Sequence, residues 1–253
     1  MDRNANGKIV YSQLKVCLSL ILVIFDLEIH LVKKFAIVVA AGSGIRMGGN
    51  IPKQFLPVNG KPLLWYTLRT FLQTYSDIQI ILVLQKQHAD AGNELITTLG
   101  AQKRIIIVDG GDTRFESVKN GLRLVENPAV VFVHDGVRCL VTEKLIRQCY
   151  DETILKRNAI PVVKAVDSLR MDMPGGTRVL DRNHVHIVQT PQTFLSEDIL
   201  RAFDQEYDES FTDEASVAEK AGVNINLIEG EPENIKVTRP VDLHMAMFFL
   251  LNR

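Results

Sequence analysis

Two positively charged side chains stand in a glycine-rich segment near the start of the chain. The segment runs from Ala40 to Phe55, reads AAGSGIRMGGNIPKQF, and carries Arg46 and Lys53 after the apolar run FAIVV. Glycines let backbone N–H groups approach phosphate oxygens, while arginine offers a planar fork of donors and lysine a compact charge. A glycine loop alone is more often a plain turn, but the two cations favour an anion site. We therefore expect the segment to bind a nucleoside triphosphate and to neutralise its phosphates.

Two common nucleotide-binding motifs do not fit this loop. A Walker A motif needs Gly-Lys-Ser/Thr after its glycines, and no such sequence follows here. The dinucleotide motif G-x-G-x-x-G would place a glycine where Met47 stands. A dinucleotide fold would also end its second strand in an acidic residue, and this position holds Gln85 and Lys86. The sequence therefore argues against both classes.

Short runs rich in valine and isoleucine alternate with amphipathic segments from residue 35 onward. The runs cover residues 35–40, 78–84, 104–109, 130–135 and 159–166. Continuous apolar runs of this length are typical of strands buried on both faces. Helical periodicity is present in residues 62–75, 114–125 and 142–157, and Thr142 is a candidate N-cap. We therefore expect an α/β fold with a doubly wound, mostly parallel sheet.

Ligands in such a sheet bind beyond the carboxyl ends of the strands. Polar and glycine residues follow four of the runs: Gly42, Gly44, Arg46 and Lys53 after the first, Gly110, Gly111, Asp112 and Ser117 after the third, Asp135 and Arg138 after the fourth, and Asp167 and Ser168 after the fifth. An acid such as Asp135 at the end of a buried strand must be solvated, paired or bound to a metal. We expect its neighbour His134 to be structural. The convergence of these residues on one edge indicates a site more strongly than any single motif.

The alternation of strands and helices stops after Val166. Residues 167–194 alternate polar and apolar side chains around the turn MPGG, which predicts an antiparallel hairpin. Such a β-arm, at about residues 164–188, is either a plain surface excursion or a clasp for a second subunit, and we expect a homodimer. Further patterns predict helices at 196–207 and 212–222, strands at 224–230 and 234–238, and a last helix from residue 239.

The composition of the 253-residue chain limits the functions to consider. The formal net charge of −1 gives no reason to expect a nucleic-acid partner. The three cysteines provide no disulfide framework and no metal-site spacing, so we expect a reducing, cytoplasmic location. No Ser-His-Asp or Cys-His arrangement is evident, and we expect no side-chain nucleophile.

Residues 1–33 differ in character from the rest of the chain. Their apolar run, LKVCLSLILVIF, is roughly half of the about 20 residues that a membrane span needs. No clear small-residue cleavage site follows the run, which argues against a signal peptide. We expect a dispensable N-terminal extension, a single domain over residues 34–253, and no membrane contact. An export signal is the alternative.

Six motifs occur in a characteristic order from about Phe35 to the end of the chain. They are AAGSGIRMG with PKQF, DGGDTRFESV, HDGVR, LDRN with QTPQTF, TDEAS, and EGEPENIKVTRP. In order and spacing they resemble the 2-C-methyl-D-erythritol 4-phosphate cytidylyltransferase family. The resemblance implies a Rossmann-like sheet with a projecting antiparallel β-arm for dimerisation. It also implies transfer of CMP from CTP to 2-C-methyl-D-erythritol 4-phosphate, yielding 4-diphosphocytidyl-2-C-methyl-D-erythritol and pyrophosphate, with help from Mg²⁺, in the non-mevalonate route to isoprenoids.

The same resemblance implies a role for each matching residue. Arg46 and Lys53 correspond to the pair that stabilises the α-phosphorus of CTP, and Lys236 to a further cation between the two substrates. Arg182, on the arm, corresponds to the residue that grips the sugar phosphate from the neighbouring subunit. Without the resemblance, Arg182 and Lys236 would each be interpreted as solvated charges. The implied CTP site comprises Ala40, Ala41, Gly42, Gly44, Gly111, Asp112 and Ser117. The implied substrate or metal contacts are Asp135, Arg138, Ser168, Thr190 and Thr212, with Asp135 as the candidate metal ligand.

Two positions depart from the family pattern, and two rival functions stay open. Cys139 stands where proline is common, which would loosen its loop or expose a thiol, and Ser168 replaces a frequent threonine. A ribitol 5-phosphate cytidylyltransferase would share the glycine loop, PKQF and NIKVT, although TDEAS and LDRN favour methylerythritol phosphate. A nucleotide-binding protein that has lost catalysis is the other rival, and the retained cations argue against it.

Overall fold

The computed structural model describes residues 32–42 and 51–252 of the chain. The chain separates into two compact units, Met1–Lys33 and Lys34–Arg253. The expected extension lies outside the described residues up to residue 31, and so do Gly44 and Arg46 of the glycine loop. The domain boundary at residues 33 and 34 stays a prediction.

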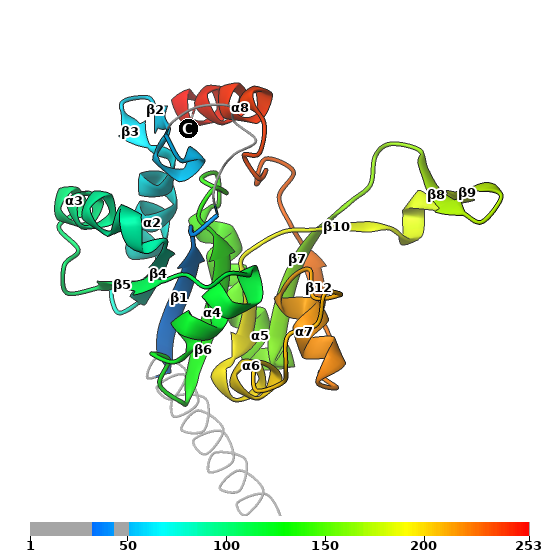
Figure 1. Ribbon diagram of the computed structural model, residues 1–253, viewed down its shortest axis with the longest axis horizontal. Coiled ribbons are helices and arrows are strands. Elements are labelled where there is room, and N and C mark those ends of the chain that lie inside the picture. Colours follow the sequence, from blue (N-terminus) through cyan, green and yellow to red (C-terminus); the bar gives the residue numbers. More distant parts are fainter. Residues whose placement is uncertain (1–31, 43–50, 253) are drawn as a thin grey trace, which may run out of the picture. The chain divides into compact units, whose positions relative to one another are not determined.

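The predicted parallel strands form the centre of an eight-stranded sheet (Figure 1). The five apolar runs correspond to β1 (Lys33–Val39), β4 (Gln79–Leu84), β5 (Ile105–Asp109), β6 (Ala129–Asp135) and β7 (Asn158–Lys164). Both β1 and β5 pair with β4 in parallel. The strand order is β10-β7-β11-β6-β1-β4-β5, with β12 (Leu227–Glu229) paired in parallel to β7.

Two strands run against this direction. β11 (Gln192–Leu195) is antiparallel to both β6 and β7, between which it lies, and β10 (His186–Val188) is antiparallel to β7. Both strands belong to the chain as it returns from the hairpin after β7. The result is a mixed, mostly parallel sheet with extra antiparallel strands, which confirms the predicted fold class.

Helices cover both faces of the sheet because side chains alternate along its buried strands. On β6, Val131 belongs to a core cluster that includes Val118 of α4 (Arg114–Leu122). The next residue, Phe132, contacts Phe71 of α2 (Leu63–Thr74), with ring centroids 5.9 Å apart. The other described helices are α3 (Ala89–Leu99), α5 (Glu143–Lys156), α6 (Ser196–Ala202), α7 (Glu214–Lys220) and α8 (Pro240–Leu251).

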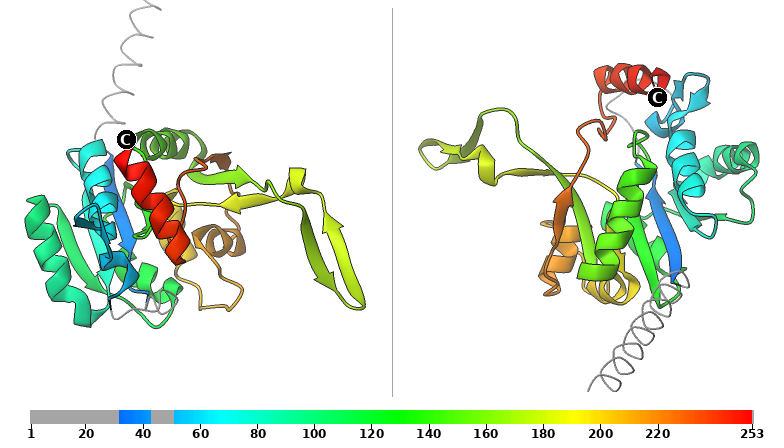
Figure 2. Two further views of the ribbon diagram at one scale, coloured as in Figure 1. Left: turned by 90° about the horizontal axis from the view of Figure 1, so that it is seen from above. Right: turned by 180° about the vertical axis from the view of Figure 1, so that it is seen from behind.

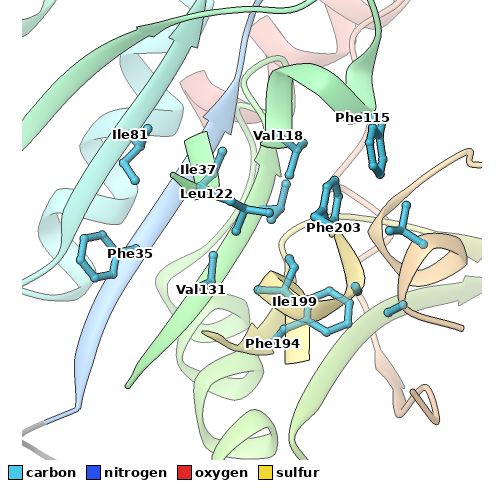
Figure 3. Close-up of a cluster of buried hydrophobic side chains, with 14 of the residues drawn as sticks. Phe35, Ile37, Ile81, Phe115, Val118, Leu122, Val131, Phe194, Ile199 and Phe203 are labelled. Atoms are coloured by element: carbon cyan, nitrogen blue, oxygen red, sulfur yellow. The ribbon is translucent and has the colours of Figure 1, made fainter. Parts of the chain in front are cut away.

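The core cluster on the α4 face joins strands and helices from distant parts of the sequence (Figure 3). Ile37 and Val131 come from the sheet, and Phe115 and Val118 from α4. Phe115 stacks on Phe203, which follows α6, with centroids 4.8 Å apart. The start of α4 is therefore fixed against both the sheet and the C-terminal part of the fold.

The predicted β-arm is a hairpin with a sheet of its own. β8 (Leu169–Met173) and β9 (Gly176–Leu180) pair only with each other among the described strands. Figures 1 and 2 show them standing away from the eight-stranded sheet. Pro174 and Gly175 form the turn, and Gly175 has φ 87°, a conformation that glycine adopts without strain. A short helical turn, η4 (Arg182–His184), follows β9.

The structure differs from the sequence-based prediction in three local elements. Residues 234–238 form no strand: the N–H groups of Asn234 and Ile235 bond to the nearby carbonyls of Glu231 and Glu233, and a single described backbone hydrogen bond, Val237 N–H to the carbonyl of Val137 at 3.1 Å, joins the segment to a distant part of the chain. Helix α3 was not anticipated, and neither was the small hairpin of β2 (Pro57–Val58) and β3 (Lys61–Pro62). Within the described residues, no helix is both long and apolar enough to cross a bilayer.

Candidate active site

A cavity of about 450 Å³ lies at the carboxyl ends of four neighbouring strands. Its lining includes Ala40 to Gly42 after β1, Gln85 after β4, Gly111 to Arg114 after β5, and Asp135 at the end of β6. Lys53 and Lys236, from segments outside the sheet, complete it together with Ser117. The loops after β1, β5 and β6 therefore meet at one edge, as predicted, whereas Asp167 and Ser168, which follow β7, do not line the cavity.

Two adjacent glycines permit close contacts in the loop after β5. A Cβ atom on Gly110 would lie 2.4 Å from the Cβ of Ala41, in the loop after β1, and one on Gly111 would lie 2.3 Å from the Cβ of Glu116, on α4. A larger residue at position 110 would therefore push the loops after β1 and β5 apart, and one at position 111 would push the loop away from the start of α4. The hydroxyl of Ser117 accepts a hydrogen bond from the N–H of Gly111 at 3.1 Å and holds this loop in place. One side of the cavity is thus formed by backbone and small side chains.

Lys53 is carried into the cavity by a short helical turn, η2 (Lys53–Phe55). The next residue, Gln54, is buried, and its side-chain amide donates a hydrogen bond to the carbonyl of Ala40 at 2.8 Å. This contact ties the turn to the end of β1. Sequence reasoning did not single out Gln54, although its place directly after Lys53 in PKQF was the available signal.

Three cations surround the carboxylate of Asp135. The amine of Lys236 lies 3.0 Å from Oδ2, Nε of Arg138 lies 3.4 Å from Oδ2, and Nη2 of Arg114 lies 3.4 Å from Oδ1. Burial alone would raise the pKa of Asp135, but the charges of Arg114, Lys236 and Arg138 outweigh it and hold this pKa well below its usual range. Asp135 is therefore an ionised group at neutral pH.

The segment that carries Lys236 is anchored on both sides of that residue. Arg138 donates to the carbonyl of Asn234 at 2.8 Å, and the side-chain amide of Asn234 donates to the carbonyl of Thr190 at 2.8 Å. On the other side, the backbone hydrogen bond of the buried Val237 fixes the chain to Val137, two residues after β6. Lys236 is thus positioned on the same cavity lining as Lys53.

Arg114, which is partly exposed, and the buried Glu214 form an ion pair that the sequence did not reveal. Nη2 of Arg114 lies 3.0 Å from Oε2 of Glu214, and Nη1 bonds to Oε1. Burial raises the pKa of Glu214, and the guanidinium of Arg114 opposes that shift. Both residues lie inside recognised motifs, DGGDTRFESV and TDEAS, but nothing in the sequence indicates that they meet.

Thr190 and His134 form buried hydrogen bonds next to the cavity that hold the backbone around Asp135 in place. The carbonyl of Arg138 can only accept, so Nε2–H of His134 donates to it at 3.2 Å, and Nδ1 accepts from the hydroxyl of Thr190 at 3.1 Å. The same hydroxyl accepts from the backbone N–H of Asp135 at 3.1 Å. Burial lowers the pKa of His134 to about 4, so its imidazole is neutral at pH 7. Thr190 is buried and does not line the cavity.

Several predicted contacts lie outside this cavity. Arg182, Ser168 and Thr212 are exposed, and none of them is among the lining residues. Arg182 donates to the carbonyl of Val166 at 2.6 Å, at the base of the arm. Cys139 is buried among apolar residues, so the expectation of an exposed thiol is wrong. Arg46 and Gly44 lie outside the described residues.

Comparison with known proteins places this geometry in a family. Residues 34–252 match the family model of 2-C-methyl-D-erythritol 4-phosphate cytidylyltransferase. The chain is 45% identical over 215 residues to the Bacteroides fragilis protein of that name, covering 85% of this chain and 98% of that protein.

Two solved structures share the fold. The 4-diphosphocytidyl-2C-methyl-D-erythritol synthase of Anaerococcus prevotii has a TM-score of 0.75 at 27% identity, over 87% of this chain and 99% of that chain. The 2-C-methyl-D-erythritol 4-phosphate cytidylyltransferase of Francisella tularensis has a TM-score of 0.71 at 30% identity, over 85% and 99% of the two chains. The chain therefore belongs to the 2-C-methyl-D-erythritol 4-phosphate cytidylyltransferase family of nucleotidyltransferases.

Proposed function

We propose that the cavity binds CTP with its phosphates toward Lys53 and Lys236 and transfers CMP to 2-C-methyl-D-erythritol 4-phosphate, with release of pyrophosphate. The observation that carries this assignment is the meeting of Lys53 and Lys236 on one lining, beside the ionised Asp135. The two substrates are anions that repel each other, and fixed cations lower that cost. The acceptor phosphate attacks the α-phosphorus of CTP directly, so no side-chain nucleophile takes part.

The backbone-lined side of the cavity is suited to the cytosine and ribose of CTP. Ala40, Ala41 and Gly42 face Gly111 and Asp112 across this part of the lining, which also includes Ser117. Because these loops offer backbone groups rather than bulky side chains, a flat base can approach their N–H and C=O groups. The roles of Gly44 and Arg46, on the phosphates and the α-phosphorus, remain part of the proposal.

The donor set of the cavity is compatible with Mg²⁺ bound together with the triphosphate. No cluster of three or more histidine, cysteine, aspartate or glutamate side chains occurs in the described part of the chain. Two carboxylates, Asp112 and Asp135, line the cavity. Mg²⁺ is commonly held by one or two carboxylates, with phosphate oxygens and water as its other ligands. We assign Asp135 as the protein ligand; the ion, when bound, offsets negative charge on the phosphates.

The acceptor site takes residues from beside the cavity and from the arm. Arg138 lies beside Asp135, whereas Ser168 and Arg182 lie at the base of the arm and Thr212 precedes α7. Arg182 would reach the sugar phosphate of a neighbouring subunit if two copies clasp each other by their arms. The exposed apolar side chains of the arm, including Met171, Met173 and Val179, support such a homodimer. A cytoplasmic location belongs to the same proposal.

The reaction is tested by measuring pyrophosphate release from CTP with each acceptor in turn. We expect rapid release with 2-C-methyl-D-erythritol 4-phosphate and slow release with ribitol 5-phosphate. A preference for ribitol 5-phosphate would replace the proposed acceptor. Release with neither acceptor, in a protein that still binds CTP by calorimetry, would instead identify a binding protein without catalysis.

A further inference from the structure

A chain of charged contacts leads from outside the cavity to its phosphate-binding end. Glu214, the first residue of α7, has a side chain that is 1% exposed and does not line the cavity. Its two oxygens bond to the two terminal nitrogens of Arg114. Arg114 contacts Asp135, and Asp135 holds the amine of Lys236 at 3.0 Å. Glu214 is therefore connected to Lys236 through two intermediate side chains.

Glu214 is presented by a rigid helix start. Asp213 caps α7 by accepting from the N–H of Ser216 at 2.9 Å. The buried side chain of Gln192 bonds to both sides of Glu214: it donates to Asp213 at 2.9 Å and accepts from the N–H of Ala215 at 2.8 Å. These contacts fix the backbone of Glu214 to strand β11.

Arg114 is presented in the same way by the start of α4. Thr113 and Glu116 form a reciprocal capping box around it. The next residue, Phe115, stacks on Phe203 and on Phe211, with centroids 4.8 and 5.6 Å away (Figure 3 shows the first pair). Because both helix starts are fixed, the ion pair between them can hold the guanidinium of Arg114 in a defined position as well as neutralise its charge.

We propose that Glu214 is a positioning residue for the transfer of CMP. By bonding to both terminal nitrogens of Arg114, it allows the carboxylate of Asp135 to stay in contact with the amine of Lys236. The inference rests on the proposed function of Lys236. Arginine prefers to bind a carboxylate with two nitrogens. With Glu214 in place, both terminal nitrogens of Arg114 are committed to Glu214, and only one of them also lies near Asp135. Without that carboxylate, Arg114 turns its fork to Asp135 and draws it away from Lys236.

The variant that tests this is Glu214→Gln, which keeps the size of the side chain and removes its charge. We expect the single-turnover rate of CMP transfer to fall by about 10- to 100-fold, because small displacements of a charged group at the reacting atoms have effects of this size. The dissociation constant of CTP, measured by calorimetry, is expected to change by less than about 3-fold, since Glu214 does not line the cavity. A folded variant with the wild-type rate would overturn the proposal.

Asp198→Asn is the matched control within the same chain. Asp198 is a carboxylate with a 6% exposed side chain, held by two nitrogens of Arg157 at 2.9 and 3.0 Å. It lies on α6 and does not line the cavity. We expect this variant to lose thermal stability but to keep its rate. If Asp198→Asn slows transfer as much as Glu214→Gln does, the effect is one of general stability and the inference is wrong.

A double-mutant cycle separates action through Arg114 from a direct effect. In an Arg114→Lys background, which keeps the charge but not the fork, Glu214→Gln is expected to slow transfer by less than about 2-fold further. An equal slowing in both backgrounds would show that Glu214 does not act through Arg114. If Glu214→Gln does not fold, Glu214→Asp, whose shorter side chain weakens the paired contact with Arg114, serves for the rate and for the structural measurement.

A crystal structure of the Glu214→Gln protein gives a readout that needs no turnover. We expect the distance from the Lys236 amine to Oδ2 of Asp135 to lengthen from 3.0 Å beyond hydrogen-bonding range. An unchanged distance overturns this inference even if the enzyme is active. Wild-type protein that transfers no CMP would overturn the proposed function instead, so the two failures are distinguishable.

Discussion

The carboxyl edge of the sheet and the β-arm present their functional cations in opposite ways. At the edge, Lys236 contacts a buried carboxylate that two arginines also hold, and its backbone is anchored on both sides. On the arm, Arg182 is exposed, and its described side-chain contact is a single bond to the carbonyl of Val166. The first cation is positioned by its own chain, whereas the second lies outside the cavity that the described residues form.

This contrast separates two ways of building an active site. A preorganised cation pays little reorganisation cost when charge develops in the transition state, so it is suited to the reacting phosphorus. An exposed cation on a hairpin contributes after a second surface closes over it, so it is suited to binding and to coupling activity with assembly. We therefore expect edge residues to control the rate, and arm residues to control acceptor affinity and oligomeric state.

The largest effect is expected from the edge cations. Lys53→Ala and Lys236→Ala should each lower kcat by about 10²- to 10³-fold, because each removes a fixed charge from the proposed binding position of the α-phosphorus. Single-turnover assays with saturating CTP measure this, and Lys103→Ala, at an exposed lysine outside the cavity, is the control. An undiminished kcat in either cavity variant would remove that residue from catalysis.

Lowering the pH should reduce the free energy of unfolding because of His134, a buried residue next to the carboxyl edge of the sheet. Its pKa is about 4 in the folded protein because of burial and about 6.5 when unfolded, so between these values the unfolded state binds more protons. Stability contributed by neutral His134 is therefore lost as the pH falls from 6.5 towards 4, by up to about 3 kcal/mol. The lowered pKa of Asp135 affects stability only below the pKa of its unfolded state, about 4, so it does not contribute to the loss of stability between pH 7 and pH 5.

Urea unfolding at pH 7 and pH 5 measures this loss. We expect wild-type protein to lose about 2 kcal/mol over this range and His134→Gln to lose much less, the difference between them cancelling the contributions of other groups. His184→Gln is the control on the arm, where the side chain is exposed, and it should behave like wild type. Equal losses in wild type and His134→Gln would contradict the prediction.

Arg182→Ala should reveal the different role of the arm. We expect the KM for 2-C-methyl-D-erythritol 4-phosphate to rise by about 10-fold or more, the value of a lost charge-assisted hydrogen bond, while calorimetry shows unchanged CTP binding. Deleting the hairpin of β8 and β9 should convert the protein to a monomer in sedimentation experiments. If Arg182→Ala weakens CTP binding and leaves the acceptor KM unchanged, the division between edge and arm fails.

The smallest effect is expected from two matched helix caps. Thr142 accepts from the N–H of Leu145 at 3.1 Å and caps α5, and Asp181 accepts from the N–H of Asn183 at 3.0 Å and caps η4 on the arm. Thr142→Ala should reduce the free energy of unfolding by about 1 kcal/mol. Asp181→Ala should change it by less than about 0.5 kcal/mol, because no arm residue belongs to either core cluster of the described residues. Equal costs would mean that the arm is part of the cooperative unit.

The local sequence pattern was sufficient to predict a helix or strand where that element follows from the spacing of its own residues. The valine- and isoleucine-rich runs became the central strands, and Thr142 became the cap of α5, because both depend on residues close in sequence. Helix α3 was not predicted, and it contains Gly92, a residue type that disfavours helices. A Cβ at this position would lie 2.6 Å from the side chain of Leu84, so the glycine allows α3 to pack closely against β4. The segment 234–238 has a strand-like composition, but composition does not reveal whether a neighbouring strand is available to pair with it.

The sequence by itself determined that glycines, Lys53 and an acid would gather at the carboxyl edge of a mostly parallel sheet, because that topology brings the ends of neighbouring strands together. Only the tertiary structure decided which charges neutralise one another. The pair of Arg114 and Glu214, and the use of the Thr190 hydroxyl to hold His134 and the backbone of Asp135, join segments far apart in the chain. Such pairings depend on distances of a few ångströms between side chains, and no spacing along the sequence encodes those distances.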